Sequence, residues 1–505
     1  MLNQLCKTVL LFSFVLNIST SVANNFTHHN VDKANDIFDK MVNYHGGEEA
    51  IKALDKVLVD YDHSINYRTQ GYGYEGLEYH SNRPGNTLSL ISFNDKINWW
   101  QFQYKYMQSF HSTISLHRNG LTHNYNDITQ TFTEKSNDDF NKRIESQILR
   151  NPLLLIKSAL NHLDSLRYLG EQSLDKKSYH LIALKLASGT VLTTYVDQSN
   201  YQMVKVEYLA RSKLTEYSFS AYQTVGNFNV PFFIKRNLPE HYYSSYFHYK
   251  VANYNFEPNV EQTAIVPNDY VLTQKKNTYD GKLRIQTIGK GLYWLTRNGS
   301  NTLFVEFSDY VMAVDANGFG LDDRIGKFRE LVPSKPIKYV SISHHHHDHM
   351  EQVSFYAKQG VTIITAKEFI PLLNKRISDV YPDKSVKPIF DIVTQKAEYA
   401  DETQRVEIYE MKNMLHAETM LMTYFPAEQL IYLPDHYEDM YLIENNQPIR
   451  LLLSEIERLG LKVTGFIQAH GNEIFSLEKV RAAVALPIKM KNLRRQPHQT
   501  VITKE

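Results

Sequence analysis

Six consecutive side chains that can bind a metal ion, His344 to His349, follow directly after an apolar segment of the sequence. That segment, Ile337–Ser343, is rich in β-branched and aromatic residues and predicts a buried strand. In an open α/β sheet, sites form at the edge where the strands end. Because neutral imidazole and carboxylate groups are zinc ligands, we expect the chain to fold so that a metal site lies at the end of this strand.

A histidine run alone would also fit a solvated loop, so the rest of the chain has to decide. Three further candidate ligands lie beside later predicted strands: His416, Asp435 and His470. Strands and helices alternate in this half of the chain, which is typical of an α/β arrangement. Candidate ligands that recur at strand ends favour a built site over a solvated loop.

The pattern His344-x-His346-x-Asp348-His349 resembles the metal-binding motif of the metallo-β-lactamase superfamily. The later order of His416, Asp435 and His470-Gly471 is similar to that of the remaining ligands of that family. The resemblance covers about residues 285–475. It implies a C-terminal αβ/βα sandwich. Together with the β-rich pattern of the N-terminal half, the expected fold is an α+β chain with two domains, in which this sandwich follows an antiparallel β-rich domain with a few helices.

The resemblance also implies a ligand set for two zinc ions. One ion would be held by His344, His346 and His416, the other by Asp348, His349 and His470, with Asp435 bridging the two. A carboxylate between two dications reduces their mutual repulsion. The implied reaction is attack by a metal-bridging hydroxide, which Asp348 would orient as the catalytic residue.

Neighbouring residues refine this expectation. His345 and His347 stand where the motif has no ligands, and we expect them to support the site or face solvent, with a general acid as the alternative. Asp315 is expected to support residues 344–349, which we call the metal loop. Met350 and Pro434 stand where the family usually has small residues, which changes the rim of the expected pocket. The substrates of known family members therefore do not predict the substrate of this chain.

The expected function is hydrolysis of an ester-, lactone-, amide- or sulfate-like bond in a small molecule. Cys6 is the only cysteine, so no cysteine ligand is present as in many penicillin-cleaving relatives, and β-lactam hydrolysis ranks lower. His346 stands where di-iron relatives usually carry glutamate, which favours zinc. Two alternatives stay open: a mono-iron oxidoreductase of the same superfamily, and a secreted ligand-binding protein with a vestigial metal site.

The N-terminal half has a different pattern. Apolar residues at helical spacing predict a helix over Val31–Tyr44, and a second helical pattern, about 138–163, is broken at Pro152. Runs rich in Tyr, Phe and Val predict strands, and turn residues at 197–200 and 225–227 predict antiparallel hairpins. The order of these elements weakly resembles the half-barrel domains of lipoprotein carriers.

Residues 1–23 read as a signal peptide, because Lys7 precedes a short apolar run and small residues follow at 21–23. The apolar run is shorter than the roughly 20 residues that span a bilayer. We therefore expect an exported protein, periplasmic or secreted, with no integral membrane segment after cleavage. The expected organisation is a signal peptide (1–23), a β-rich domain (24–271), a linker (272–282), a metal-binding domain (283–480) and a C-terminal tail (481–505).

Composition limits the remaining partners. The 55 Lys and Arg residues balance 55 Asp and Glu residues, which removes the electrostatic case for nucleic-acid binding. Hydrophobic residues make up 42% of the chain, as in ordered globular proteins. The sequence leaves a homodimer open.

Overall fold

The computed structural model describes residues 28–74, 80–106, 109–127, 130–136, 139–210, 213–238, 246–273, 281–317, 321–435, 447–471 and 473–485. Its contacts divide the chain into two compact units. Unit 1 comprises Met1–Tyr67, Asn82–Tyr104 and Ser112–Gln274, and unit 2 comprises Arg68–Ser81, Lys105–His111 and Lys275–Glu505. The sequence predicted a single boundary, whereas the contacts group two short segments of the N-terminal half with unit 2.

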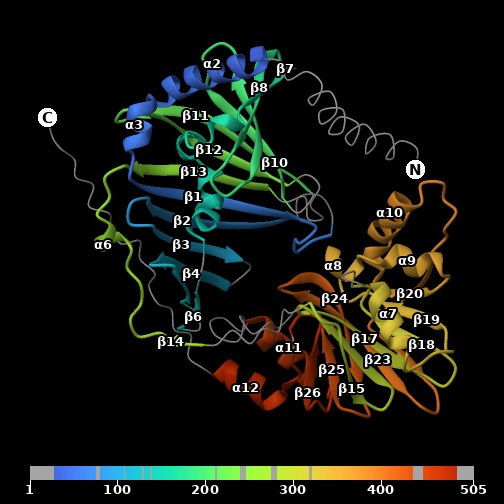
Figure 1. The fold of residues 1–505 in the computed structure, drawn as a ribbon. Helices are drawn as coiled ribbons and strands as arrows, with labels where there is room; N and C mark the ends of the chain where they lie inside the picture. The colour runs from blue at the N-terminus through green and yellow to red at the C-terminus, as the bar shows by residue number, and fades with distance from the viewer. Residues whose placement is uncertain are drawn as a thin grey trace. The chain divides into compact units, whose positions relative to one another are not determined.

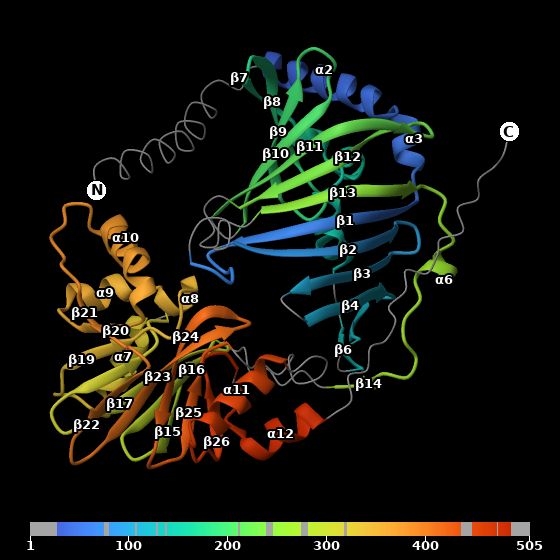
Figure 2. The ribbon, with the colours of Figure 1, turned by 180° about the vertical axis from the view of Figure 1, so that it is seen from behind.

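Unit 1 is built on one 14-stranded sheet (Figures 1 and 2), with the strand order β14-β6-β5-β4-β3-β2-β1-β13-β12-β11-β10-β9-β8-β7. The strands are β1 (Lys56–Arg68), β2 (His80–Ser92), β3 (Ile97–Tyr106), β4 (Ser109–Arg118), β5 (Leu121–Asn126), β6 (Thr131–Lys135), β7 (Arg167–Leu174), β8 (Lys177–Lys185), β9 (Val191–Asp197), β10 (Met203–Ala210), β11 (Lys213–Val225), β12 (Phe228–Asn237), β13 (Tyr246–Asn255) and β14 (Val271–Leu272). The two predicted hairpins are present, since β9 pairs with β10 and β11 with β12, both antiparallel.

The helices of unit 1 are α2 (His28–His45), α3 (Glu48–Ala53), α4 (Phe140–Ile148), α5 (Pro152–Ala159), the 3-10 turn η2 (Leu163–Ser165) and α6 (Val260–Thr263). Helix α2 buries Ala34, Phe38 and Met41 on one face and packs on the large sheet. It ends at Gly46, whose φ of 135° an L side chain rarely adopts. The helix predicted over Val31–Tyr44 is confirmed.

The second predicted helical pattern is two helices rather than one broken helix. Asn151 caps α5, because its side chain accepts a hydrogen bond from the amide of Leu153 at 3.0 Å. Pro152 is the first residue of α5, where its missing N–H costs no hydrogen bond. The proline therefore begins a helix instead of interrupting one.

Unit 2 contains two sheets. The first runs β15-β16-β17-β18-β19-β20-β21 and the second β22-β23-β24-β25-β26-β27. The strands of the first sheet are β15 (Arg284–Gly289), β16 (Leu292–Arg297), β17 (Ser300–Glu306), β18 (Val311–Val314), β19 (Ile337–Ser341), β20 (Thr362–Thr365) and β21 (Ile389–Ile392). Those of the second are β22 (Lys396–Ala400), β23 (Arg405–Met414), β24 (Ala417–Phe425), β25 (Leu430–Leu433), β26 (Gly465–Gln468) and β27 (Phe475–Ser476).

Helices accompany both sheets of unit 2 (Figures 1 and 2). They are α7 (Leu321–Arg329), α8 (His347–Met350), α9 (Val353–Lys358), η3 (Lys367–Phe369), α10 (Ile370–Val380), α11 (Gln447–Arg458) and α12 (Leu477–Ala485). One apolar core joins residues of both sheets with α7, α9 and α10. A second core packs α11 and α12 on the second sheet. The expectation of a β-rich chain with several sheets and few helices is confirmed.

Three segments expected from the sequence lie wholly or partly outside the described residues. The predicted signal peptide lies outside the described residues, and so do 274–280 of the expected linker and 486–505 of the expected tail. The first residues of that tail, 481–485, belong to α12, because Val480 and Val484 pack into the core beneath α11. Among the described residues, we find no helix with the length and apolar character needed to cross a bilayer.

Candidate metal centre

The predicted ligands lie where strands of unit 2 end. The segment 344–349 follows β19 and enters α8, and His416 lies in the turn between β23 and β24. Asp435 follows β25 and His470 follows β26. Because β25 and β26 are parallel, their carboxyl ends meet at the same edge of the second sheet. The amide of Leu421 donates to the carbonyl of Ser343 at 2.6 Å, which joins β24 to the end of the first sheet.

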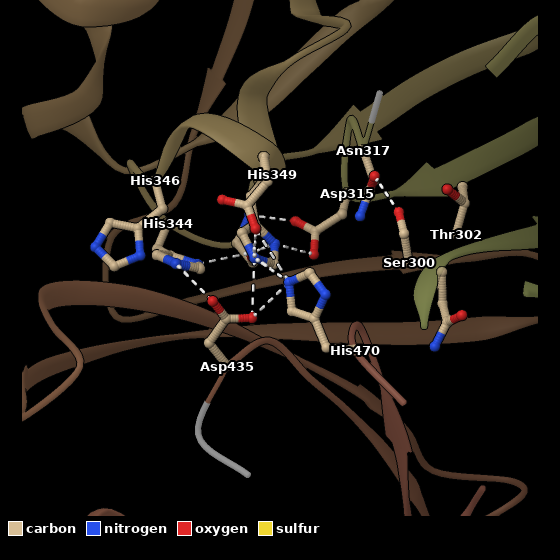
Figure 3. A network of polar contacts seen from close by, with 12 residues as sticks. Ser300, Thr302, Asp315, Asn317, His344, His346, His349, Asp435 and His470 are labelled. Carbon is tan, nitrogen blue, oxygen red and sulfur yellow. Dashed lines mark hydrogen bonds and ion pairs between the residues drawn. The ribbon is translucent and has the colours of Figure 1, made fainter. Parts of the chain in front are cut away.

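The seven predicted ligands come together in two overlapping groups. One group is His344, His346, His416 and Asp435, and the other is Asp348, His349, Asp435 and His470. Within each group, one nitrogen or oxygen of every residue lies within 4.8 Å of the corresponding atoms of the others. Figure 3 shows His344, His349, Asp435 and His470 pointing toward one another.

In the first group, the ring nitrogens face one another at short range. Nε2 of His416 lies 3.1 Å from Nε2 of His344 and 2.9 Å from Nδ1 of His346. All three rings are buried. Burial, and then neighbouring imidazoles, hold the pKa values of His344 and His346 well below the ordinary value, so both rings are neutral.

In the second group, the imidazoles lie beside carboxylates rather than beside other imidazoles. Nε2 of His470 lies 3.1 Å from both Asp348 Oδ2 and Asp435 Oδ1. Burial alone would lower the pKa values of His349 and His470, but the surrounding carboxylates raise both well above the ordinary value. Conversely, burial would raise the pKa of Asp348, but His349 and His470 hold it below its ordinary value.

Asp435 lies between the groups and presents a different oxygen to each. Its Oδ2 lies 3.2 Å from Nε2 of His416, in the first group. Its Oδ1 lies 3.0 Å from Nε2 of His349, in the second group. Burial would raise the pKa of Asp435, but His349 and His470 lower it well below the ordinary value, so the carboxylate stays ionised. One carboxylate thus offers an anionic oxygen to two sets of imidazoles.

Hydrogen bonds behind the ligands orient several of the rings. Asp315 Oδ2 accepts from Nδ1 of His349 at 2.8 Å, and its Oδ1 accepts from the amide of Ser343 at 2.9 Å. The carbonyl of Gly299 accepts from Nδ1 of His470 at 3.2 Å. An acceptor on Nδ1 leaves Nε2 as the nitrogen that faces the group in both rings, where it would carry a lone pair once a cation replaced its proton. Asp315 therefore makes the contact to the metal loop that the sequence predicted.

These side chains could hold a metal ion such as zinc. Zinc takes histidine nitrogen and carboxylate oxygen at about 2.0–2.2 Å, and four such ligands around one ion lie roughly 3.3–3.6 Å apart. The facing atoms here are separated by 2.9 to 3.8 Å. Two neutral, buried rings with converging lone pairs, and carboxylates beside them, form a donor set suited to a cation.

The remaining residues of the histidine run take supporting places. His345 is buried and donates from Nε2 to the carbonyl of Gly71 at 3.0 Å. His347 is buried against the guanidinium of Arg376, and burial lowers its pKa to about 3. Both contacts match the expected supporting role rather than a ligand role.

Sequence reasoning missed several residues that shape this site. Asn301, at the start of β17, donates from Nδ2 to the carbonyls of Gln468 and Gly471 at 2.9 and 2.8 Å and so holds the turn that carries His470. Ser300, beside it, donates to Asn317 at 2.6 Å (Figure 3). Gln70 and Gly71, from the loop after β1, contact the metal loop. Small polar residues and glycines of this kind carry no spacing signal that would reveal their partners.

Comparison with solved structures finds metallo-β-lactamases among the similar chains. A metallo-β-lactamase from Pontibacter korlensis is 15% identical, over 41% of this chain and 98% of that chain, with a TM-score of 0.32. FIM-1 from Pseudomonas aeruginosa, in a mono-zinc form, is 17% identical over 41% of this chain and 94% of that chain, with a TM-score of 0.31.

A DUF1329 family protein from Desulfovibrio piger is also similar. It is 12% identical over 44% of this chain and 93% of that chain, with a TM-score of 0.30. No protein-family model matches the sequence, and no curated protein matches it.

Proposed function

We propose that this protein is an exported hydrolase that holds two zinc ions in unit 2, an αβ/βα sandwich, and cleaves an ester-, lactone-, amide- or sulfate-like bond of a small molecule. The observation that carries the proposal is the position of Asp435 between two histidine sets. Its Oδ2 lies 3.2 Å from Nε2 of His416, and its Oδ1 lies 3.0 Å from Nε2 of His349. Such an arrangement suits two cations that share one anionic ligand, because the shared charge offsets their repulsion.

The first ion would be held by His344, His346 and His416, and the second by Asp348, His349 and His470. When bound, the pair would supply Lewis acidity toward the substrate and lower the pKa of a water molecule toward neutrality. Asp348 is half-buried, and its pKa is held below the ordinary value, so the carboxylate stays ionised and Oδ2 is available as a ligand. Its Oδ1 accepts one hydrogen bond and keeps further acceptor capacity, with which it could orient an attacking water.

A panel of chromogenic lactones, aryl esters, sulfates, anilides and a cephalosporin tests this proposal. We expect cleavage of at least one of the first four classes, its loss on treatment with a chelator, and recovery on addition of Zn²⁺. Asp348→Ala should lower kcat by about 10²–10⁴-fold, the size expected for a group that orients a proton transfer.

The matched control is Asp379→Asn, a carboxylate on α10 whose contact is an exposed ion pair with Lys375. Since exposed pairs contribute little to stability, this variant should keep both turnover and metal content. Cleavage that survives the chelator, or full turnover by Asp348→Ala, contradicts the proposal. Sequencing the N-terminus of the exported protein, expected near residue 24, tests the localisation.

A further inference from the structure

The loop between β1 and β2 contributes residues to unit 2 that contact the candidate metal centre. The contacts place Arg68–Ser81 in unit 2, although the remainder of both flanking strands belongs to unit 1. The carbonyl of Thr69 accepts from the amide of His347 at 3.3 Å, and that of Tyr72 accepts from the amide of Glu418 at 2.9 Å. The loop therefore bonds both to the metal loop and to β24, two residues beyond His416.

Gln70, in this loop, holds the carboxylate of Asp348. Its Nε2 donates to Asp348 Oδ1 at 2.8 Å. The other oxygen, Oδ2, lies 3.1 Å from Nε2 of His470. A hydrogen bond to one oxygen fixes the rotation of the carboxylate, and this rotation decides where the other oxygen points. Gln70 thereby directs Asp348 Oδ2 into the second ligand group.

The next residue, Gly71, holds a ligand of the first group. Its carbonyl accepts from Nε2 of His346 at 2.8 Å. A carbonyl can only accept, so Nε2 carries the proton and Nδ1 of His346 carries a lone pair. That Nδ1 is the atom that lies 2.9 Å from Nε2 of His416. The backbone of the loop thus sets the tautomer in which His346 can bind a cation.

Tyr74 anchors this part of the loop against two aromatic rings of unit 2. The ring of Tyr74 packs edge-on against His345, with centroids 6.1 Å apart, and against Phe369, at 6.3 Å. Gly71 is buried, and so are His345 and Phe369. The buried Gly71 and the packed ring of Tyr74 keep residues 71–74 in place, which is the condition for a supporting residue to orient a ligand.

We propose that the loop from the N-terminal half of the sequence completes the metal centre, with Gln70 as a positioning residue for the second ion and Gly71 for the first. This inference rests on the metal centre of the proposed function. It adds that residues 281–485, although they contain all seven ligands, lack two groups that orient those ligands.

Gln70→Met tests the inference, because methionine has a similar length and volume but no donor. Outer hydrogen-bond partners of metal ligands are typically worth about 10–100-fold in metal affinity. We expect the variant to bind its second Zn²⁺ about 10–100-fold more weakly and its first with wild-type affinity. The readouts are competition with a chromophoric chelator and the visible spectrum of the Co²⁺-loaded full-length protein, in which only the bands of the second ion should change.

The control is Gln359→Met, an exposed glutamine at the end of α9, which should bind both ions as the wild type does. The thermal unfolding of metal-free Gln70→Met is measured in parallel, and an unchanged midpoint shows that the loss lies at the metal site. Wild-type affinity for both ions in Gln70→Met overturns the inference. If the wild type binds two ions but cleaves no substrate, the proposed reaction fails, and the zinc affinity of Gln70→Met still decides the role of Gln70. A wild type that binds fewer than two ions overturns both.

Discussion

Asp435 is the residue on which both halves of the candidate centre depend. Each of its oxygens faces a different histidine set, and the carboxylate is kept ionised by the imidazoles around it. The other predicted ligands each belong to one group. A change at Asp435 should therefore affect both ions, whereas a change at His470 or His416 should affect one.

Asp435→Asn preserves the volume of the side chain and removes its charge. We expect the affinity for each of the two ions to fall at least about 10-fold, or about 1.4 kcal/mol, because each loses an anionic ligand. Elemental analysis after dialysis measures the metal-to-protein ratio, which should fall below two. Asp379→Asn serves again as the control, and a dialysed Asp435→Asn protein that keeps two ions rules out a bridging role.

At this scale, the sequence predicted which candidate ligands gather better than it predicted the residues that hold them. His344, Asp435 and His470 could be predicted because they are strong ligand types placed where strands end, and strand ends meet at one edge of a sheet. Gln70 could not be, since it lies 278 positions from Asp348 and glutamine in a loop is ordinary. Its role follows only from the packing of the loop.

Among the secondary-structure elements, the turn after β26 places a constrained glycine next to a predicted ligand. Gly471 follows His470 and has a φ of 113°. A Cβ at this position would lie 2.7 Å from Oε1 of Gln468. The carbonyl of Gly471 accepts from Asn301, and its amide donates to the carbonyl of Gly299 at 3.1 Å. Gly299 also accepts from the ring of His470, and Asn301 also donates to the carbonyl of Gln468, so the glycine is part of the ligand's support.

Gly471→Ala should lower the free energy of unfolding by about 1–3 kcal/mol, the cost of a strained backbone. It should also lower the affinity for the second ion, because the turn that carries His470 would shift. Gly326→Ala is a control of opposite sign, since Gly326 lies inside α7, where a Cβ would meet no atom of the described residues within 4 Å beyond its own helix. Alanine there should stabilise unit 2 by about 0.5–1 kcal/mol. The midpoints of thermal unfolding of both variants test this prediction. An equal shift of the midpoint in the two variants contradicts it.

Periodicity predicted the elements of unit 2 more completely than those of unit 1. Buried strands such as β18, with four buried residues, are short apolar runs that stand out in the sequence. The strands of unit 1 mix buried and exposed residues, as β8 and β11 do, so they were only partly predicted. Nothing local in the sequence reveals that they join one 14-stranded sheet, because strand order is set by long-range pairing.

Over the whole molecule, the two units have separate apolar cores and should respond to different conditions. The candidate metal centre belongs to unit 2, so metal removal acts there. Unit 1 instead contains His45, which is fully buried where α2 ends. Its Nδ1 donates to the carbonyl of Asn229 at 3.0 Å, and its Nε2 accepts from the amide of Met203 at 3.4 Å. Both ring nitrogens are thus satisfied by the neutral form of the ring.

Acid should therefore destabilise unit 1 through His45. Burial lowers its pKa from 6.5 to about 4, so between these values the unfolded chain binds a proton that the folded chain does not. The stabilisation is complete above pH 6.5 and declines as the pH falls toward 4, by about 2 kcal/mol between pH 7 and pH 5. His63, buried in the same unit, also has a pKa lowered to about 4 by burial and acts in the same direction.

His45→Gln isolates this contribution, because an amide can donate and accept as the neutral ring does but does not titrate over this range. Urea unfolding at pH 7 and pH 5, followed by a probe in unit 1, should show that the variant loses about 2 kcal/mol less than the wild type over this interval. The histidines of the metal centre titrate equally in both proteins, so their contribution cancels in the difference. Equal losses in both proteins would mean that the ring of His45 is protonated in the folded chain at pH 5, and acid stability would then have to be set elsewhere in the molecule.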